Sequence, residues 1–181
     1  MKVLVTGATS FLGQHIVAQL AERGDIVTTF QRSSFDGPGV SMRGSINDSD
    51  AISKAMTDQE AVIHLAAKVA PLGSWKDFCS INVGGTRTLH AAAVAEGVSR
   101  FVYISTPSVA HSGSSISGGS ALPAMPDTVI GNYSKSKAIA ENWVLQQSNM
   151  SLPVVALRPH LVIGAGDPQL IGRVVDRAKH N

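Results

Sequence analysis

The stretch KVLVTGATSFLG, residues 2–13, joins a short apolar run to a glycine-rich turn and the start of a helical pattern. The run at 2–6 is typical of a buried strand. Gly7 permits a tight turn after the strand, and Gly13 permits close packing of a helix against it. The unpaired N–H groups at the start of such a helix, together with its dipole, favour a pyrophosphate. The stretch therefore predicts a strand, a phosphate-binding turn and a helix, in that order.

Ser10 stands at the place of the middle glycine in the usual dinucleotide-binding turn. Its hydroxyl can donate to a phosphate, whereas its side chain opposes the closest approach of a cofactor to the backbone. The alternative is a plain strand-to-helix turn, because isolated glycine-rich matches also occur by chance. The residues that we assign to the phosphate-binding turn are Gly7, Thr9, Ser10, Phe11, Leu12 and Gly13.

Beyond this turn, short apolar runs alternate with segments of helical period. The alternation is typical of βαβ units around a parallel sheet, whose ligand crevice lies at the carboxyl ends of the strands. We predict one domain over residues 1–181, an α/β doubly wound parallel sheet of the Rossmann type. The predicted strands are 2–6, 25–30, 39–43, 61–65, 100–105 and 153–158, and the predicted helices are 11–23, 48–57, 75–96 and 131–148.

Composition narrows the class of protein. Of the 181 residues 44% are hydrophobic, which is enough apolar material for one packed domain. The net charge of +2 includes no basic block, which argues against nucleic acid or an anionic membrane as a partner. The single cysteine, Cys79, belongs to no metal-binding pattern, so we expect a cytoplasmic protein without a metal. The apolar start is too short for a membrane span.

The end of the second predicted strand bears on the choice of dinucleotide. An NAD site commonly has a carboxylate here for the ribose 2′-hydroxyl, and this sequence has none. Arg32 and Ser33 suit the 2′-phosphate of NADP, Arg32 as a planar charged fork and Ser33 as a donor. We therefore expect NADP. The alternative is NAD, with Gln31 binding the ribose hydroxyls.

Tyr133 and Lys137 lie one turn apart on the same face of the last predicted helix. A lysine ammonium beside a phenol favours the phenolate, which makes a group that titrates at about 10 usable near neutral pH. The spacing alone is weak support. Its weight comes from the preceding strand, which ends in the hydroxyl run at 105–108, at the sheet edge where ligands bind.

At this point the chain resembles the extended short-chain dehydrogenases/reductases of the NAD-dependent epimerase/dehydratase family, over nearly all of its length. Each matching piece is modest alone, but together they are highly specific. They stand in the family's order: TGATSFLG at 6–13, HLAA at 64–67, NVGGT at 82–86, FVYIST at 101–106, YSKSK at 133–137 and RPHLVIGAGD at 158–167.

The resemblance implies a catalytic set. Aligned on the strand, the catalytic hydroxyl is Thr106, whereas Ser105 points to the opposite face. The acid/base is Tyr133, the amine that binds the ribose and lowers the pKa of Tyr133 is Lys137, and the supporting Asn is Asn82. The implied cofactor contacts beyond the turn are Gln31, Arg32, Ser33, Ser45 and Ile46 near the adenosine, and Leu65, Ala66, Ala67, Tyr133, Lys137, Pro159, His160 and Leu161 towards the nicotinamide.

The resemblance is greatest to the 3β-hydroxysteroid and sterol dehydrogenase branch, on STPSV at 105–109 and RPHLVIGAGDPQL at 158–170. It implies hydride transfer between NADP or NAD and a secondary alcohol or ketone of a small lipophilic substrate, steroid-like or a long-chain β-hydroxy or β-keto acid. Pro107 and Ser108 stand where dehydratases of the family carry carboxylates, which argues against elimination. The alternatives are a nucleotide-sugar epimerase and a non-catalytic NADP-sensing or scaffold protein.

The family also implies more chain than is present. Its members continue into a last strand and a small substrate domain, whereas this sequence ends in a helical pattern at 170–179. We therefore expect an N-terminal fragment of a longer enzyme, truncated before that domain. The family further implies a homodimer through the helices at 75–96 and 131–148. His64 is expected to be a structural residue on the cofactor wall.

Overall fold

The computed structural model describes residues 1–70, 72–111, 122–164 and 177–179. Its sheet is entirely parallel, with six strands in the order β3-β2-β1-β4-β5-β6. The order reverses between β1 and β4, which puts the ligand crevice at the carboxyl ends of these two strands. The strands are β1 (Lys2–Thr6), β2 (Ile26–Gln31), β3 (Val40–Arg43), β4 (Ala61–His64), β5 (Arg100–Ile104) and β6 (Val154–Leu157).

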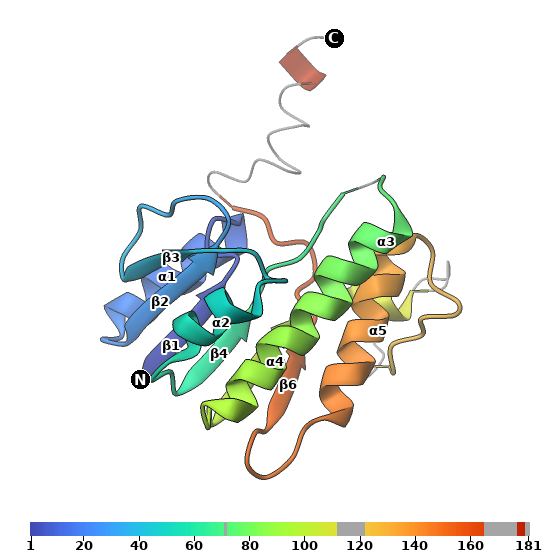
Figure 1. The fold of residues 1–181 in the computed structure, drawn as a ribbon. Coiled ribbons are helices and arrows are strands. Elements are labelled where there is room, and N and C mark those ends of the chain that lie inside the picture. The colour runs from blue at the N-terminus through green and yellow to red at the C-terminus, as the bar shows by residue number, and fades with distance from the viewer. Residues whose placement is uncertain (71, 112–121, 165–176, 180–181) are drawn as a thin grey trace.

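Helices cover both faces of this sheet (Figure 1). The predicted fold and its helices are confirmed, with ends that differ by one or two residues. The predicted helical pattern at 170–179 lies mostly outside the described residues. The helical segments are α1 (Phe11–Glu22), α2 (Ser49–Met56), α3 (Trp75–Phe78), the π-helix η1 (Cys79–Gly84), α4 (Gly85–Ala95), the 3₁₀ turn η2 (Pro107–Ala110) and α5 (Asn132–Gln146).

Side chains alternate between the two faces of the sheet and form two apolar cores. Leu4, Phe101 and Tyr103 belong to the larger core, which lies under α2, α4 and α5. Val3 and Val5 belong to the smaller core, which lies under α1. Full burial of one such side chain contributes about 1.5–3 kcal/mol. The two cores fix the helices whose first turns face the crevice.

The predicted helix at 75–96 contains a π-helical segment that its apolar spacing did not predict. Within η1 the neighbouring residues Asn82 and Val83 are both buried, and the segment leads directly into α4. Short π-helical segments are frequent at functional sites. Here the segment carries the predicted supporting residue, Asn82, into the interior.

Among the described residues, none of the helices combines the length and the apolar character needed to cross a membrane. Within the same ranges, no three His, Cys, Asp or Glu side chains come together as a metal site.

Candidate dinucleotide and catalytic site

The turn after β1 needs its two glycines for different steric reasons. Gly7 has a φ of 75°, in the left-handed region, and a Cβ there would lie 2.8 Å from the Ala66 nitrogen. A Cβ at Gly13 would lie 2.5 Å from the Gly7 carbonyl oxygen. The N–H groups of Phe11 and Leu12, at the start of α1, have no partner within the helix. The turn therefore has the close packing and the free donors of a phosphate site.

Ser10 caps α1 instead of offering its hydroxyl to a phosphate. The hydroxyl donates to the Gly7 carbonyl oxygen at 2.8 Å and accepts from the Gly13 N–H at 3.1 Å. This geometry corrects the expectation that the hydroxyl is a free donor, because its only proton is directed into the turn. We therefore expect backbone N–H groups to bind a phosphate at this turn.

We expect Gly13→Ala to weaken dinucleotide binding at least about tenfold, because the new methyl group displaces the Gly7 carbonyl and with it the turn. Gly84→Ala is the matched control, since the nearest atom to its Cβ is 3.8 Å away. Titration of NADPH fluorescence gives both dissociation constants. Wild-type affinity in Gly13→Ala would contradict the assignment of the turn.

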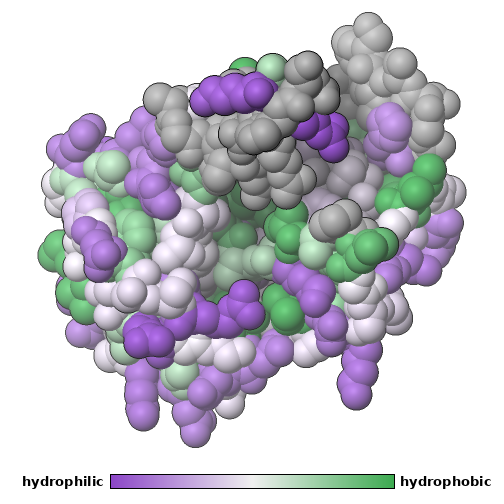
Figure 2. Space-filling model, turned by 90° about the horizontal axis from the view of Figure 1, so that it is seen from above, coloured by the Kyte–Doolittle hydropathy of each residue, from purple (hydrophilic) through white to green (hydrophobic). Residues whose placement is uncertain are grey.

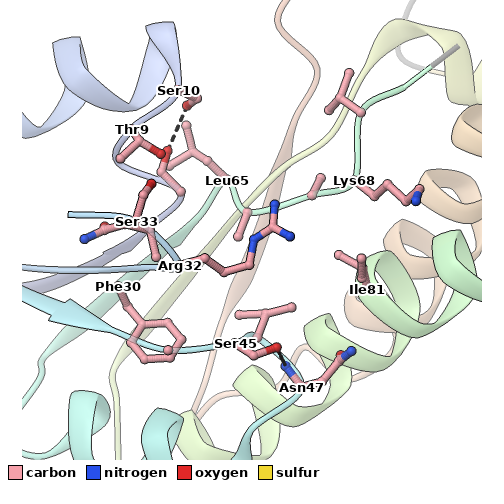
Figure 3. Close-up of a pocket in the computed structure, with 17 residues that line it drawn as sticks. Thr9, Ser10, Phe30, Arg32, Ser33, Ser45, Asn47, Leu65, Lys68 and Ile81 are labelled. Atoms are coloured by element: carbon pink, nitrogen blue, oxygen red, sulfur yellow. Dashed lines mark hydrogen bonds between the residues drawn. The ribbon is translucent and has the colours of Figure 1, made fainter. Parts of the chain in front are cut away.

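A pocket of about 520 Å³ opens beside this turn, between β2, β3 and the chain after β4 (Figure 3). Most of the predicted cofactor residues line it: Gly7, Thr9, Ser10, Gln31, Arg32, Ser33, Ser45, Ile46, Leu65, Ala66 and Ala67. The sequence did not single out the remaining six: Phe30, Gly44, Asn47, Lys68, Val69 and Ile81. Asn47 directly follows the predicted cofactor residue Ile46, and Lys68 directly follows Ala67, which was the available signal. The contribution of Ile81 depends on the packing of η1.

The charged residues of the pocket are cations, and none of the described residues that line it is an Asp or a Glu. Lys68 pairs with Asp77 at 3.2 Å. Arg32 is exposed and extends across the pocket mouth (Figure 3). Gln31 is buried, and its amide nitrogen donates to the Ser41 hydroxyl on β3 at 3.0 Å. Arg32 is therefore the side chain best placed for an additional anionic group.

The predicted catalytic hydroxyls meet at the carboxyl end of β5. Burial raises the pKa of Tyr133, and a hydrogen bond with Thr106 acts in the opposite direction. Thr106 also lies 3.1 Å, oxygen to oxygen, from the Ser108 hydroxyl. Ser105 is buried, in agreement with its predicted position on the other face of the strand. The Tyr133 phenol is thus held in its protonated form beside a second hydroxyl.

Lys137 is buried under the same edge. Its Nζ donates to the Ile104 carbonyl at 2.6 Å and lies 4.0 Å from the centroid of the Tyr103 ring. Burial lowers the pKa of Lys137 to about 7, and the negative charge of Glu141 acts against this shift. The expectation that Lys137 lowers the pKa of Tyr133 is not met in this geometry. The desolvation of the phenol dominates, and the amine is directed to the Ile104 carbonyl.

The Asn82 side chain makes no hydrogen bond to the side chains of Thr106, Tyr133 or Lys137. Its Oδ1 accepts the Lys68 N–H at 2.7 Å, and its Nδ2 donates to the Lys68 carbonyl at 3.2 Å and to the Ser136 hydroxyl at 2.9 Å. It therefore ties the chain after β4 to α5, and its part in catalysis stays a prediction.

Of the residues after β6 that the structure describes, none lines the pocket. Pro159 is half-buried, and His160 and Leu161 are exposed. Their contact with the nicotinamide end of a cofactor stays a prediction. His64 is buried with both ring nitrogens in hydrogen bonds, as expected of a structural residue.

With this geometry in view, a comparison with known families is decisive. A sequence model described as the NAD dependent epimerase/dehydratase family matches residues 3–181. The chain belongs to this family. The resemblance found in the motifs is thereby confirmed.

Individual members of the family agree with this assignment. The chain is 40% identical to a 2-alkyl-3-oxoalkanoate reductase of Stenotrophomonas maltophilia, over 99% of this chain and 56% of that protein. It is 31% identical to a 3 beta-hydroxysteroid dehydrogenase/Delta 5-->4-isomerase of Mycobacterium tuberculosis, over 97% of this chain and 50% of that protein. Among solved structures, MoeE5 in complex with UDP-glucose and NAD matches with a TM-score of 0.84 and 30% identity. The match covers 98% of this chain and 60% of that chain. The chain spans about half the length of the curated relatives it matches.

Proposed function

We propose that this chain is the dinucleotide-binding part of a longer oxidoreductase, which interconverts a secondary alcohol and a ketone on a lipophilic substrate with NADP. The observation that carries the proposal is the contact between Tyr133 and Thr106 beside the buried Lys137, at the sheet edge that adjoins the dinucleotide pocket. Relatives named for reduction of an oxoalkanoate and dehydrogenation of a 3β-hydroxysteroid support the substrate class.

When bound, the nicotinamide supplies or accepts a hydride at the substrate carbon. Tyr133 is protonated at neutral pH, because a phenol titrates at about 10 and burial raises this pKa further, so it can donate a proton to the oxygen of a ketone. Thr106 hydrogen-bonds the same oxygen as negative charge develops on it. The Lys137 amine donates one N–H to the Ile104 carbonyl, and its remaining N–H groups suit ribose hydroxyls.

An apolar rim beside the catalytic residues supports a lipophilic substrate. Val69 and Leu72 follow β4, and Ile130 precedes α5; all three are exposed. The Asn132 side chain donates to the Gly73 carbonyl at 3.0 Å, so the two segments meet. Figure 2 shows the side of the molecule towards which the strands run. Its surface is hollowed near the centre, and apolar side chains line the hollow.

Arg32 supports NADP rather than NAD. Its guanidinium reaches across the mouth of a pocket that has no carboxylate among its described lining residues, and Ser33 adds a hydroxyl beside it. Arg forms charged, often bidentate, hydrogen bonds with phosphate, and no such partner is present in NAD at the 2′ position.

We expect Arg32→Gln to weaken NADP binding about tenfold or more and to change NAD binding by less than about threefold, because only NADP loses a charged contact. Arg100→Gln is the control, since this exposed residue begins β5 and so lies at the amino ends of the strands, away from the pocket. Calorimetric titration of each variant with NADP and with NAD gives the dissociation constants, and from them the loss of affinity for each dinucleotide. An equal loss for NADP and NAD would argue for a general electrostatic effect and against a 2′-phosphate contact.

The proposed activity is tested in the native-length protein with NADPH and three substrates: a 2-alkyl-3-oxoalkanoate, a 3-ketosteroid and a nucleotide sugar. We expect oxidation of NADPH with one of the two lipophilic ketones. Conversion of the nucleotide sugar without net change in the cofactor would identify an epimerase instead. Binding of NADPH without turnover of any substrate would favour a sensing or scaffold protein.

A further inference from the structure

A buried hydrogen-bonded cluster lies where the strand order reverses. His64 ends β4 and lies beside Thr6, the last residue of β1. The His64 Nδ1 is 2.7 Å from the Thr6 hydroxyl oxygen, and its Nε2 is 3.0 Å from the hydroxyl oxygen of Thr86 on α4. All three side chains are buried. Because water does not reach these groups, each proton must have a partner within the cluster.

The direction of every hydrogen bond follows from Thr86. Its hydroxyl oxygen is 2.6 Å from the Asn82 carbonyl oxygen, which only accepts. Thr86 therefore donates its single proton to Asn82 and accepts from His64 Nε2. The imidazole then carries its proton on Nε2, and its Nδ1 accepts from the Thr6 hydroxyl. The Thr6 oxygen in turn accepts the Ala66 N–H at 3.2 Å.

This order requires a neutral imidazole, which has one donor and one acceptor. Burial lowers the pKa of His64 to about 3, and the positive charge of Lys137 acts in the same direction. A second proton on the ring would sit on Nδ1, which would then face the Thr6 hydroxyl proton instead of accepting it.

The two ends of the cluster reach the two halves of the site. Ala66 belongs to the pocket wall. At the other end, the Asn82 side chain binds the Lys68 N–H on that wall and the Ser136 hydroxyl on α5. Ser136 donates to the Tyr133 carbonyl at 2.8 Å. A continuous set of hydrogen bonds thus joins the pocket wall to the first turn of α5, where the proton donor stands.

We propose that Thr6, His64 and Thr86 are positioning residues: a relay of fixed polarity that holds the pocket wall at Ala66–Lys68 in register with the catalytic helix α5. The inference rests on the proposed function for its effect on turnover, but the polarity of the relay stands on the geometry alone. A misplacement of about 1 Å between reacting groups lowers the rate about 100-fold, so even partial loss of the relay affects the chemical step.

The polarity is tested first, on the 181-residue chain without cofactor. Nitrogen-15 NMR of the imidazoles reports which ring nitrogen carries the proton, and the His64→Gln variant assigns the signal. We expect His64 to be the Nε2–H tautomer and to remain neutral down to pH 5. An Nδ1–H tautomer or a doubly protonated ring at pH 5 would overturn the relay, whether or not the chain turns out to belong to an enzyme.

The positioning role is tested with a matched pair of variants. Thr86→Val keeps the shape of the side chain but removes the hydroxyl, and Thr86→Ser keeps the hydroxyl. In the native-length protein, we expect Thr86→Val to lower kcat at least about tenfold and to weaken NADPH binding by a smaller factor, because Ala66–Lys68 form only one wall of the pocket and the Ser10 hydrogen bonds of the turn after β1 remain. Thr86→Ser restores kcat. Amide hydrogen exchange at Ala66 accelerates in the valine variant only.

Three outcomes of this pair count against the positioning role: an unchanged kcat in folded Thr86→Val, equal losses in kcat and NADPH affinity, or a serine variant as slow as the valine variant. If Thr86→Val does not fold, Thr86→Ser and the wild-type tautomer still decide the polarity. If the wild type turns over no substrate, the proposed function fails, and the exchange of the Ala66 amide decides whether the relay holds the pocket wall.

Discussion

Replacement of Tyr133 by Phe lowers kcat roughly 10²- to 10⁴-fold and leaves the affinity for NADP nearly intact, because the variant loses the proton donor and keeps the ring. The phenol is protonated at neutral pH, since burial raises its pKa, and Thr106 lies within hydrogen-bonding reach of it. Steady-state turnover of the native-length protein with NADPH and a ketone, together with a dinucleotide titration, measures both effects.

The control for this prediction is the same substitution at Tyr103, the other tyrosine of the chain. The Tyr103 ring is buried under Lys137, and Phe keeps the ring face on which the ammonium lies. We expect Tyr103→Phe to retain kcat within about threefold. Unchanged turnover in Tyr133→Phe would remove Tyr133 from the mechanism.

Replacement of Arg158 by Leu lowers the free energy of unfolding by about 3–5 kcal/mol, because it leaves a buried carboxylate without its partner. Glu141 on α5 is 1% exposed, and the Arg158 Nε lies 3.2 and 3.1 Å from its two oxygens. The same guanidinium donates to the Leu122 carbonyl at 2.7 Å. Urea unfolding at neutral pH measures the loss.

The double variant Glu141→Leu with Arg158→Leu is the control for this ion pair. Because replacing both partners by apolar side chains leaves no charge in the interior, we expect it to recover most of the lost stability. A double variant as unstable as Arg158→Leu would mean that the cost comes from packing or from the Leu122 contact. Removal of Glu141 also takes away the charge that opposes the lowering of the Lys137 pKa.

Apolar spacing and the glycine turn were sufficient to predict the sheet, its helices and the tight turn between β1 and α1. Gly7 and Gly13 could be interpreted correctly because their roles depend on neighbours within the same short stretch. The order of the motifs also predicted that Thr106 and Tyr133 meet, since both follow strands or begin helices at one edge of the sheet.

What the sequence did not predict depends on contacts between distant segments. The Ser10 hydroxyl was expected to be free, but the position of the Gly7 carbonyl engages it. The direction of the Lys137 amine depends on the Ile104 carbonyl, 33 residues away, and on burial that no local pattern reports. The polarity of the His64 relay requires Thr6 and Thr86, 58 and 22 residues away. Such contacts are set by the topology of the sheet.

The central claim is that one crevice joins the turn after β1 to the phenol of Tyr133 through a bound dinucleotide. A crystal structure of the chain with NADP tests it most directly. We expect the pyrophosphate at the N–H groups of Phe11 and Leu12, the 2′-phosphate at Arg32, and the nicotinamide beside Tyr133. A dinucleotide bound elsewhere, or a nicotinamide separated from the Tyr133 hydroxyl by protein, would contradict the account.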